Sequence, residues 1–227
     1  ATLSVRAEAT AAGVTRQLVA GGFTVVGAKP TGARFSLDCR PYNVPALTVH
    51  DCLYSRYAGQ ARNVECTATL GDRHGNALAV PTLVAFQSEA GEIVPATFTP
   101  EDDPTKDGAG LGQALGILNV YGAPLPFDVE PFAWETSLQW DYGCGVRKAN
   151  PRDGLVTVIA LVAGEEGFVD QDLDGTYDQG EPFIDLGEPF VDIDDDGIRD
   201  PAEWYEDVNE DGSYTGPDGK RHARAVR

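Results

Sequence analysis

Several features of an ordinary enzyme are missing from this sequence of 227 residues. It has no methionine, and its three histidines, His50, His74 and His222, lie far apart. The metalloprotease motif H-E-x-x-H, the nucleophile motif G-x-S-x-G and a phosphate-binding glycine loop are absent. The sequence therefore predicts a non-catalytic protein. A secreted hydrolase is a less favoured alternative, because acidic pairs of the kind that glycosidases use are abundant.

Long apolar runs are also missing. No apolar stretch reaches the roughly 18 residues of a membrane helix, and the N-terminus lacks the charged and apolar regions of a signal peptide. We therefore expect no membrane insertion. The missing initiator methionine indicates a processed product or a part of a longer chain.

Basic residues are scarce in one quarter of the chain. Of the 36 acidic residues, 20 lie between Glu165 and Asp218, where Arg199 is the one basic residue. The rest of the chain has 16 acidic and 16 basic residues, so the net charge of −19 belongs to this acidic block. Such a block repels nucleic acid and anionic membranes, and it attracts cations.

The four cysteines show no metal or redox pattern. Cys39, Cys52, Cys66 and Cys144 have neither CxxC nor CxxCH spacing. Two disulfides in an oxidising, extracellular setting explain them, with buried free thiols as the alternative. We favour the pairs Cys39–Cys66 and Cys52–Cys144, because Cys39 and Cys66 fall on the first two expected strands of the main domain, and such strands are usually neighbours.

Short strands are the dominant pattern. Runs of alternating or β-branched residues recur along the chain, each bounded by Gly, Pro, Asn or Asp. The segment GDRHGNAL predicts a tight turn between two strands, in which Gly75 and Asn76 supply the positive φ that the turn needs. We expect an all-β fold with little helix, and a β-sandwich over residues 31–166.

Three segments in a fixed order resemble a known family. VECTATLGDRHGNALAVPTLVAFQSEAGEI, DGAGLGQALGIL and DGLVTVIALVAGEE are similar to the bacterial immunoglobulin-like domains of the intimin and invasin type. The matching positions are Asp72, Gly75, Asn76, Gly91, Ile93, Asp107 and Gly108. The resemblance covers about residues 35–165 and implies an immunoglobulin-like sandwich in a string of surface-displayed domains, without catalysis. The chain departs from the family at its cysteines, at the insertion YGAPLPFDVEPF and after Glu166.

Residues 1–30 predict a β-hairpin that precedes this domain. The hairpin is either the tail of a preceding immunoglobulin-like domain or a pair of strands that join another chain. Alternatively, both strands belong to one larger sandwich.

The acidic block contains a repeated calcium-loop pattern. A loop of the EF-hand type has oxygen ligands at positions 1, 3, 5, 7, 9 and 12 and glycine at position 6, and position 7 uses its backbone carbonyl. Two stretches match every position and a third matches less well, with Thr215 at position 9 and the shorter Asp218 at position 12. The predicted ligands are Asp170, Asp172, Asp174, Thr176, Asp178 and Glu181 in the first loop; Asp192, Asp194, Asp196, Ile198, Asp200 and Glu203 in the second; and Asp207, Asn209, Asp211, Ser213, Thr215 and Asp218 in the third.

We therefore predict two to three bound Ca²⁺ ions in residues 167–220. A disordered acidic tail is the alternative, but it does not explain glycine at the sixth position three times. Proline follows Glu181 and Glu188, so the exit helix of an EF-hand cannot begin there. The repeated G-E-P-F-[IV]-D instead resembles the calcium repeats of thrombospondin type 3, which implies that ions replace a hydrophobic core. Asp185 and Glu188 are candidates to share or bridge an ion.

Together these patterns predict a calcium-stabilised structural or adhesive module of a bacterial cell-surface or secreted protein. We expect a final strand within residues 221–227 that completes the sandwich. Neighbouring immunoglobulin-like domains or identical subunits are the expected partners, and a surface receptor or polysaccharide is a further candidate. The alternative is a subunit of an extracellular filament that assembles by strand exchange between chains.

Overall fold

The computed structural model describes residues 2–11, 13–24, 29–44, 63–101, 110–120, 139–141, 146–148, 155–222 and 225–226. Within these ranges the regular elements are strands, apart from one turn of 3₁₀ helix, η1 (Gly32–Arg34). The predicted all-β fold is therefore confirmed. The described residues include no helix that is long and apolar enough to cross a membrane.

Thirteen strands follow one another along the described residues, and all the strand pairs among them are antiparallel. They are β1 (Thr2–Ala11), β2 (Val14–Thr24), β3 (Phe35–Arg40), β4 (Asn63–Leu70), β5 (Leu83–Ser88), β6 (Glu92–Ile93), β7 (Ala96–Phe98), β8 (Gln113–Asn119), β9 (Gln139–Asp141), β10 (Val146–Lys148), β11 (Val158–Leu161), β12 (Ala163–Gly164) and β13 (Ala225–Val226).

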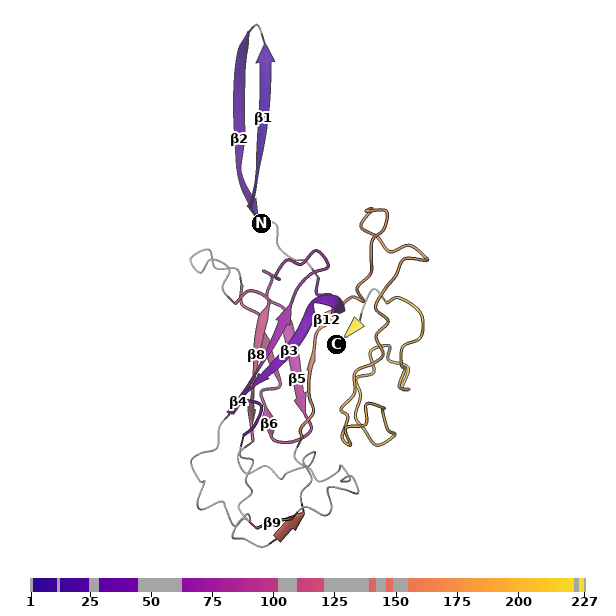
Figure 1. Cartoon of the computed structure of the whole chain (residues 1–227). Coiled ribbons are helices and arrows are strands. Elements are labelled where there is room, and N and C mark those ends of the chain that lie inside the picture. The colour runs from indigo at the N-terminus through magenta and orange to yellow at the C-terminus, as the bar shows by residue number, and fades with distance from the viewer. Residues whose placement is uncertain are drawn as a thin grey trace.

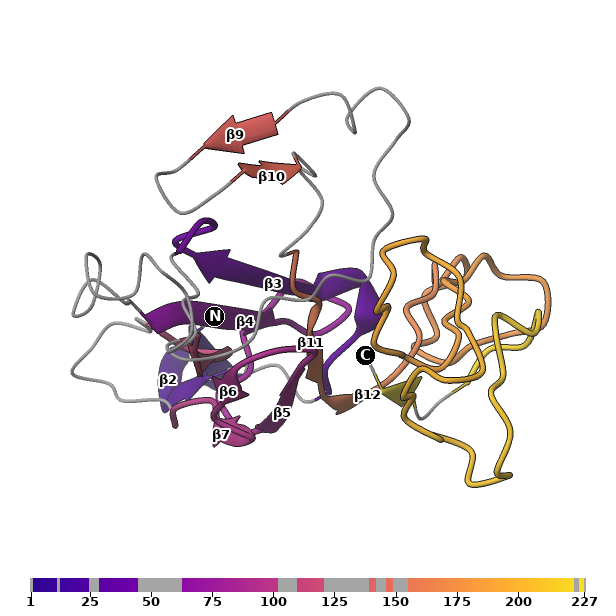
Figure 2. The same cartoon turned by 90° about the horizontal axis from the view of Figure 1, so that it is seen from below.

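Two sheets form the body of the molecule (Figures 1 and 2). One has the strand order β3-β4-β8-β6 and the other the order β11-β5-β7. Strand β4 alternates exposed and buried residues, as expected for a sheet with one face on a core. The core between the sheets consists of Ala68, Leu70, Leu78, Val84, Phe86, Ala114, Ala160 and Val162. Gly116 on β8 admits the largest of these side chains, because a Cβ there would lie 2.9 Å from the Phe86 ring.

The predicted Cys39–Cys66 disulfide is present. These residues are direct partners in the β3–β4 register, and their Cα atoms are 3.9 Å apart. The second predicted pair, Cys52–Cys144, lies outside the described residues, as do Asp107 and Gly108.

The predicted turn after β4 is present, but only Gly75 has the predicted positive φ, and the prediction of a positive φ at Asn76 is wrong. The Asp72 side chain, 7% exposed, accepts hydrogen bonds from the N–H groups of His74 and Asn76 at 3.0 and 2.8 Å. Burial opposes ionisation of Asp72, but the hydrogen bonds from Asn76 outweigh it, so its pKa is lowered. Gly75 has φ 81°, a conformation that glycine adopts without strain.

The acidic block runs beside the sandwich and then returns to it. Figures 1 and 2 show residues from about 165 onward, in orange and yellow, along one side of the sheets. Glu165 joins the block to the start of the sandwich through backbone hydrogen bonds with Pro30 and Gly32. Strand β13, within the segment where a final strand is expected, pairs with β12.

Candidate cation centre

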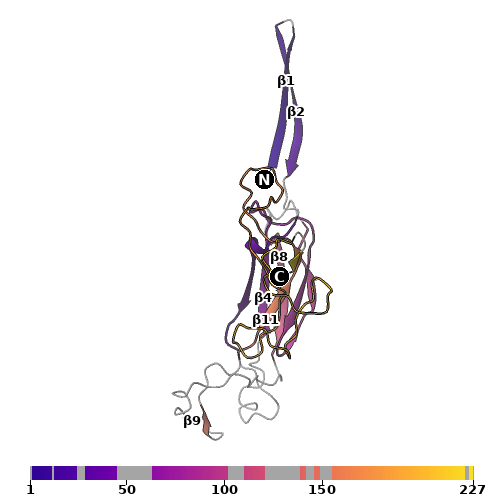
Figure 3. The same ribbon diagram turned by 90° about the vertical axis from the view of Figure 1, so that its right-hand side faces the viewer.

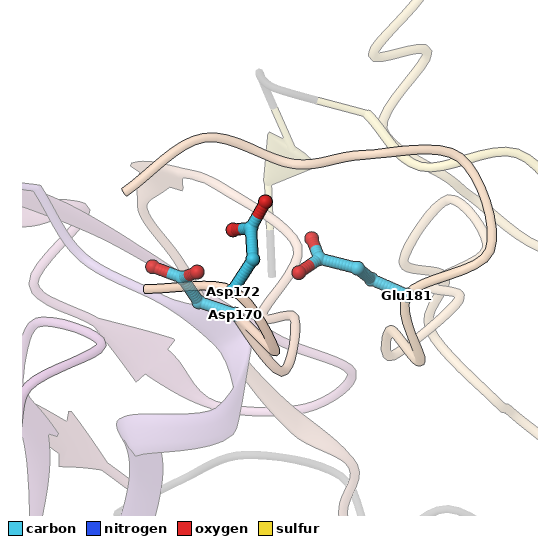
Figure 4. Close-up of side chains that lie close together, drawn as sticks. All are labelled: Asp170, Asp172 and Glu181. Atoms are coloured by element: carbon cyan, nitrogen blue, oxygen red, sulfur yellow. The ribbon is translucent and has the colours of Figure 1, made fainter. Parts of the chain in front are cut away.

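Carboxylates converge in the first two predicted loops. In the first loop, oxygens of Asp170, Asp172 and Glu181 lie within 4.8 Å of one another (Figure 4). A further group in the same loop joins Asp172 to Asp174 and Asp178. The second loop has an equivalent group, which consists of Asp192, Asp194 and Glu203. Each of these groups can hold a metal ion.

Two oxygens in these groups are buried without a donor. Asp170 Oδ1 and Asp194 Oδ1 are enclosed by the protein and accept no hydrogen bond from the described residues. Leaving a buried acceptor unsatisfied costs about 1–3 kcal/mol, and more for a charged group. Because the nearest side chains in each group are also carboxylates, a cation is the natural partner for these oxygens.

The same set of hydrogen bonds, called here the loop frame, occurs in both loops. The N–H groups at positions 2 and 9 donate to the two carboxylate oxygens of the glutamate at position 12. The N–H of the glutamate donates to the carbonyl at position 9. The N–H of the glycine at position 6 donates to the aspartate at position 1, and that of position 7 to the aspartate at position 5. These bonds range from 2.6 to 3.1 Å.

Strained backbone accompanies the frame. Position 4 of each predicted loop has a positive φ, at Leu173 (63°), Asp195 (57°) and Glu210 (60°). Non-glycine residues seldom adopt this conformation, and it costs on the order of 1–3 kcal/mol per residue. Each loop therefore keeps a shape that its own backbone does not favour.

The third loop has the same frame but takes its glutamate from elsewhere. Glu188 accepts the N–H groups of Val208 and Thr215, at positions 2 and 9, over 2.9 and 2.8 Å. The N–H of Glu188 donates to the Thr215 carbonyl at 2.9 Å. Asp207 and Asp211 accept the N–H groups of positions 6 and 7, as in the first two loops. Glu188, which precedes the loop in the chain, thus takes the place that the sequence pattern assigned to Asp218.

Asp218 belongs to a fourth copy of the frame, built from separate segments. Asp185 accepts the N–H groups of Asp218 and Gly219 at 3.2 and 2.6 Å. Asp218 in turn accepts the N–H of Lys220 at 2.9 Å. The bonds of Gly219 and Lys220 equal those of positions 6 and 7 in the other three loops, and the bond of Asp218 to Asp185 has counterparts in the second and third loops. Gly219 also has the positive φ of a sixth-position glycine, 76°.

Glu166 completes this split loop. Its carboxylate accepts the N–H groups of Leu186 and His222, which correspond to positions 2 and 9. Its own N–H donates to the His222 carbonyl at 3.2 Å. Glu166 is fully buried, and the glutamates that close the other three loops are at most 8% exposed. These four, Glu166, Glu181, Glu188 and Glu203, are the buried glutamates of the described chain.

A short motif links the four frames. The pattern E-x-[FY]-x-D occurs at 166–170, 181–185, 188–192 and 203–207. In each copy the glutamate closes one loop and the aspartate opens another. The first two copies are reciprocal, because the glutamate of each takes position 12 of the loop whose position-1 aspartate comes from the other copy. The last two copies are related in the same way. Isolated β-bridges join the central aromatic residues of each reciprocal pair, Phe168 to Phe183 and Phe190 to Tyr205.

The second reciprocal pair is inserted into the split loop. The chain leaves the split loop after Gly187 and re-enters it at Gly216, so residues 188–215 form the insertion. The two ends of the insertion touch: a Cβ on Gly187 would lie 3.1 Å from the Gly216 Cα. A cavity of about 210 Å³ at this junction is lined by Glu166, Glu188 and Asp218, among others.

Aromatic rings fill the centre of each reciprocal pair. Tyr177 contacts Phe168 and Phe183 edge-on, with centroids 5.7 and 5.8 Å away. Tyr214 makes the same contacts with Phe190 and Tyr205 at 5.9 and 5.6 Å. Arginines cover both clusters: Arg73 and Arg221 stack on the first, and Arg199 on the second. These clusters are small compared with an ordinary core, so the loops depend on other interactions.

Repulsion between the carboxylates is visible in their acidities. The charges of Asp174 and Asp172 raise the pKa of Asp178. Burial, followed by the charge of Asp196, raises the pKa of Asp194. Hydrogen bonds from Thr176 lower the pKa of Asp174 in the first loop, so the ionised form is disfavoured at Asp178 and Asp194 rather than at every aspartate of the loops.

The structure places the predicted site residues in four groups. The first and second loops bring their aspartates and glutamates together, and Thr176, Ile198 and Ser213 occupy position 7 with N–H groups bonded to the position-5 aspartates. Asn209 Oδ1 accepts the Asp211 N–H, and its amide donates to Thr215. Sequence reasoning missed Glu166, Lys220 and His222; the fourfold E-x-[FY]-x-D motif was the signal that pointed to Glu166.

Comparison with protein-family models, curated proteins and solved structures finds no match to this chain. The site is therefore interpreted from its own geometry, and the resemblance to intimin and invasin domains stays a prediction.

Proposed function

We propose that residues 165–222 bind Ca²⁺ at the four loop frames, and that the chain is a non-catalytic, calcium-stabilised structural module of an extracellular protein. The observation that supports this most directly is the set of four buried glutamates in one shared frame, with unsatisfied carboxylate oxygens at two of the sites. A bacterial surface protein with immunoglobulin-like domains is the setting that the sequence resemblance implies.

The donor set favours calcium over other common cations. The ligands offered are carboxylates, backbone carbonyls and hydroxyls, and Ca²⁺ takes six to eight such oxygens. Zinc prefers cysteine and histidine, and Mg²⁺ needs a tight octahedron in which it usually keeps several waters. The split loop has glycine near position 3 and His222 at position 9, so it offers fewer side-chain oxygens and binds more weakly than the first two loops.

Ion binding would supply folding energy that the sequence lacks. The block contains 20 acidic residues and few apolar ones, so its ionised form repels itself. Four divalent ions add eight positive charges, which changes the formal charge of the chain from −19 to −11. Because the frames bring ligands together only when folded, binding free energy becomes folding free energy.

An extracellular setting is consistent with this role. The Cys39–Cys66 disulfide is of a kind that persists in oxidising compartments. Calcium-loop affinities extend to the millimolar range in extracellular modules, where calcium is abundant. Inside a cell the same loops would stay empty and the block would be loose until export.

A calcium titration tests the proposal. Calorimetry on the decalcified protein should give close to four ions per chain, with two or more tight sites, and the melting temperature should rise with calcium. Magnesium at the same concentration is the matched control and should produce a much smaller rise. If equilibrium dialysis at millimolar calcium detects no bound ion, the proposal is wrong.

A further inference from the structure

The acidic block contacts the sandwich through side chains as well as through the chain itself. Figure 3 views the molecule from the side of the block, which lies in front of the sheets. Arg73, in the turn after β4, donates from Nη2 to the carbonyl of Gly175 at 2.6 Å, although the two residues are 102 positions apart. Gly175 is the sixth position of the first loop, so a residue of the sandwich holds this loop directly.

Arg73 holds a part of the loop that an ion does not use. Calcium loops of this type take the backbone carbonyl of position 7 as a ligand and leave that of position 6 free. The Gly175 N–H donates to Asp170 at 2.9 Å, so the peptides before and after this glycine are both fixed. The second of these peptides also carries the Thr176 N–H that donates to Asp174. Arg73 therefore supports the loop frame without competing with an ion.

The guanidinium of Arg73 also brings a positive charge to a loop with five carboxylates. It stacks on Phe168, and its Cζ atom is 5.1 Å from the centre of the ring, which keeps the charge beside the loop. A cation held there offsets part of the repulsion among the carboxylates. This compensation depends on a residue that the block itself does not contain.

The sandwich fixes the position of Arg73. The turn lies between Leu70 and Leu78, which are both buried in the core. Within the turn, Asp72 accepts the backbone hydrogen bonds described above, and the Gly71 N–H donates to the Arg34 carbonyl at 3.0 Å. Arg73 is thus in place only when the sandwich is folded.

The second loop is held by the sandwich in a comparable way. Thr157, which directly precedes β11, donates from its hydroxyl to the Asp192 carbonyl at 2.8 Å. The N–H of Thr157 donates to the Glu89 carboxylate at 2.9 Å, and its carbonyl accepts the Glu89 N–H at 3.0 Å. Asp192 is position 1 of the second loop, where the side chain and not the carbonyl is the ligand. Both of the best-matching loops are therefore held at carbonyls that an ion leaves free.

We propose that Arg73 and Thr157 are positioning residues of the first and second calcium sites, and that they couple calcium binding in these loops to the folding of the sandwich. The inference rests on the proposed calcium function. Each residue holds its loop in the ion-binding shape, and each is placed by the folded sandwich. Coupling of this kind is reciprocal, so an ion in either loop stabilises the sandwich by the factor by which the folded sandwich tightens ion binding.

Two substitutions remove the contacts and keep the side-chain bulk. Arg73→Met removes a charged hydrogen bond and should weaken calcium binding at one site about tenfold, whereas Thr157→Val removes a neutral one and should weaken another site about threefold. Calorimetric titration measures both, and the number of ions should not change. Arg16→Met is the matched control, because it makes the same change in net charge at an exposed position on β2. Its calcium affinities should equal those of the unmodified chain.

Hydrogen exchange of the β4 amides measures the other side of the coupling. In saturating calcium, Arg73→Met should lower the protection of β4 by the same factor, about tenfold. In chelator the first loop is loose and Arg73 has nothing to hold. The protection of β4 in the variant should then equal that in the unmodified chain.

Crossing these variants with loop variants separates positioning from a general effect on the sandwich. Glu181→Gln removes the ion of the first loop, so in this background Arg73→Met should cause no further loss of calcium affinity, while Thr157→Val still should. In the Glu203→Gln background, which lacks the ion of the second loop, the pattern should reverse.

Three results would overturn the coupling. If Arg73→Met has equal effects in both backgrounds, or lowers the protection of β4 equally in calcium and in chelator, Arg73 only stabilises the turn. If the unmodified chain binds calcium and Arg73→Met binds it equally tightly, the coupling is wrong and the calcium proposal stands. If the unmodified chain binds no calcium, the proposed function is wrong and this inference fails with it.

Discussion

Replacing Glu188 with glutamine tests whether a glutamate from outside the third loop closes it. Glu188 is 8% exposed and accepts N–H groups with both carboxylate oxygens. In Glu188→Gln one of those N–H groups faces an amide NH₂, which leaves a buried donor unsatisfied at a cost of about 1–3 kcal/mol. The ion at this site is also lost, which removes about 2.7 kcal/mol when calcium is 100-fold above Kd.

The expected total is about 4–6 kcal/mol of lost stability of the block in calcium, and about 1–3 kcal/mol in chelator. Calorimetric titration should show one ion fewer per chain. Glu210→Gln is the matched control, because it makes the same chemical change in the same loop at position 4, where the side chain is exposed and not a ligand. Its stoichiometry should equal that of the unmodified protein.

A double substitution distinguishes Glu188 from Asp218. If they serve different sites, as the hydrogen bonds indicate, Asp218→Asn should remove a different ion, and the double variant should lose two. If Asp218 is instead the twelfth ligand of the third loop, the double variant should lose one ion only. That outcome would refute the assignment of Glu188 and the existence of the split loop together.

Three further predictions concern the block, a turn and a glycine. Limited proteolysis should cut between Phe168 and Asp218 in chelator but not in calcium, while the strands before Glu165 survive in both; equal resistance would show that calcium does not organise the block. Asp72→Asn should lower the free energy of unfolding of the sandwich by about 1–3 kcal/mol at neutral pH. Because the pKa of Asp72 is lowered in the folded protein, this difference should persist above the ordinary pKa of about 3.9 and shrink as the pH falls through the folded pKa. Chemical denaturation at a series of pH values measures it. Gly112→Ala should cost at least about 2 kcal/mol, since its φ is 68° and a Cβ would lie 2.4 Å from the Leu70 carbonyl oxygen, whereas Gly75→Ala, with φ 81° and open space, should cost about 1 kcal/mol in the same thermal melts.

Local patterns predicted the parts of this structure that depend on neighbours in sequence. Alternation of apolar residues identified β4 and β8, because a strand with one buried face repeats every two residues. The Asp72 turn and the first two loops were predictable for the same reason: each closes within twelve residues, and its ligands and glycine stand at fixed offsets. The Cys39–Cys66 disulfide followed from the pairing of consecutive strands.

The sequence did not reveal which loops take their position-12 glutamate from a distant part of the chain. Position 12 of the third loop was sought downstream and assigned to Asp218, although Glu188 performs that role from upstream. The twelve-residue template cannot detect a ligand that lies outside its window. Glu166 was missed for the same reason, because the residues it closes, Leu186 and His222, lie 20 and 56 positions away. Counting E-x-[FY]-x-D motifs, rather than loops, would have predicted four frames.

The reciprocal arrangement explains how an acidic segment can be fastened to a sandwich at both ends. Glu166 lies two residues after β12, and the residues whose N–H groups it accepts, Leu186 and His222, belong to the middle and the end of the block. Residue 222 lies just before β13, which pairs with β12. The split loop therefore ties the exit of the sandwich to the return of the chain, and the pair formed by residues 188–215 is enclosed between them. Since a fully buried carboxylate is costly unless compensated, a cation bound in this loop would stabilise the junction as well as the block. Calcium would thus act at the place where the acidic segment and the sandwich meet.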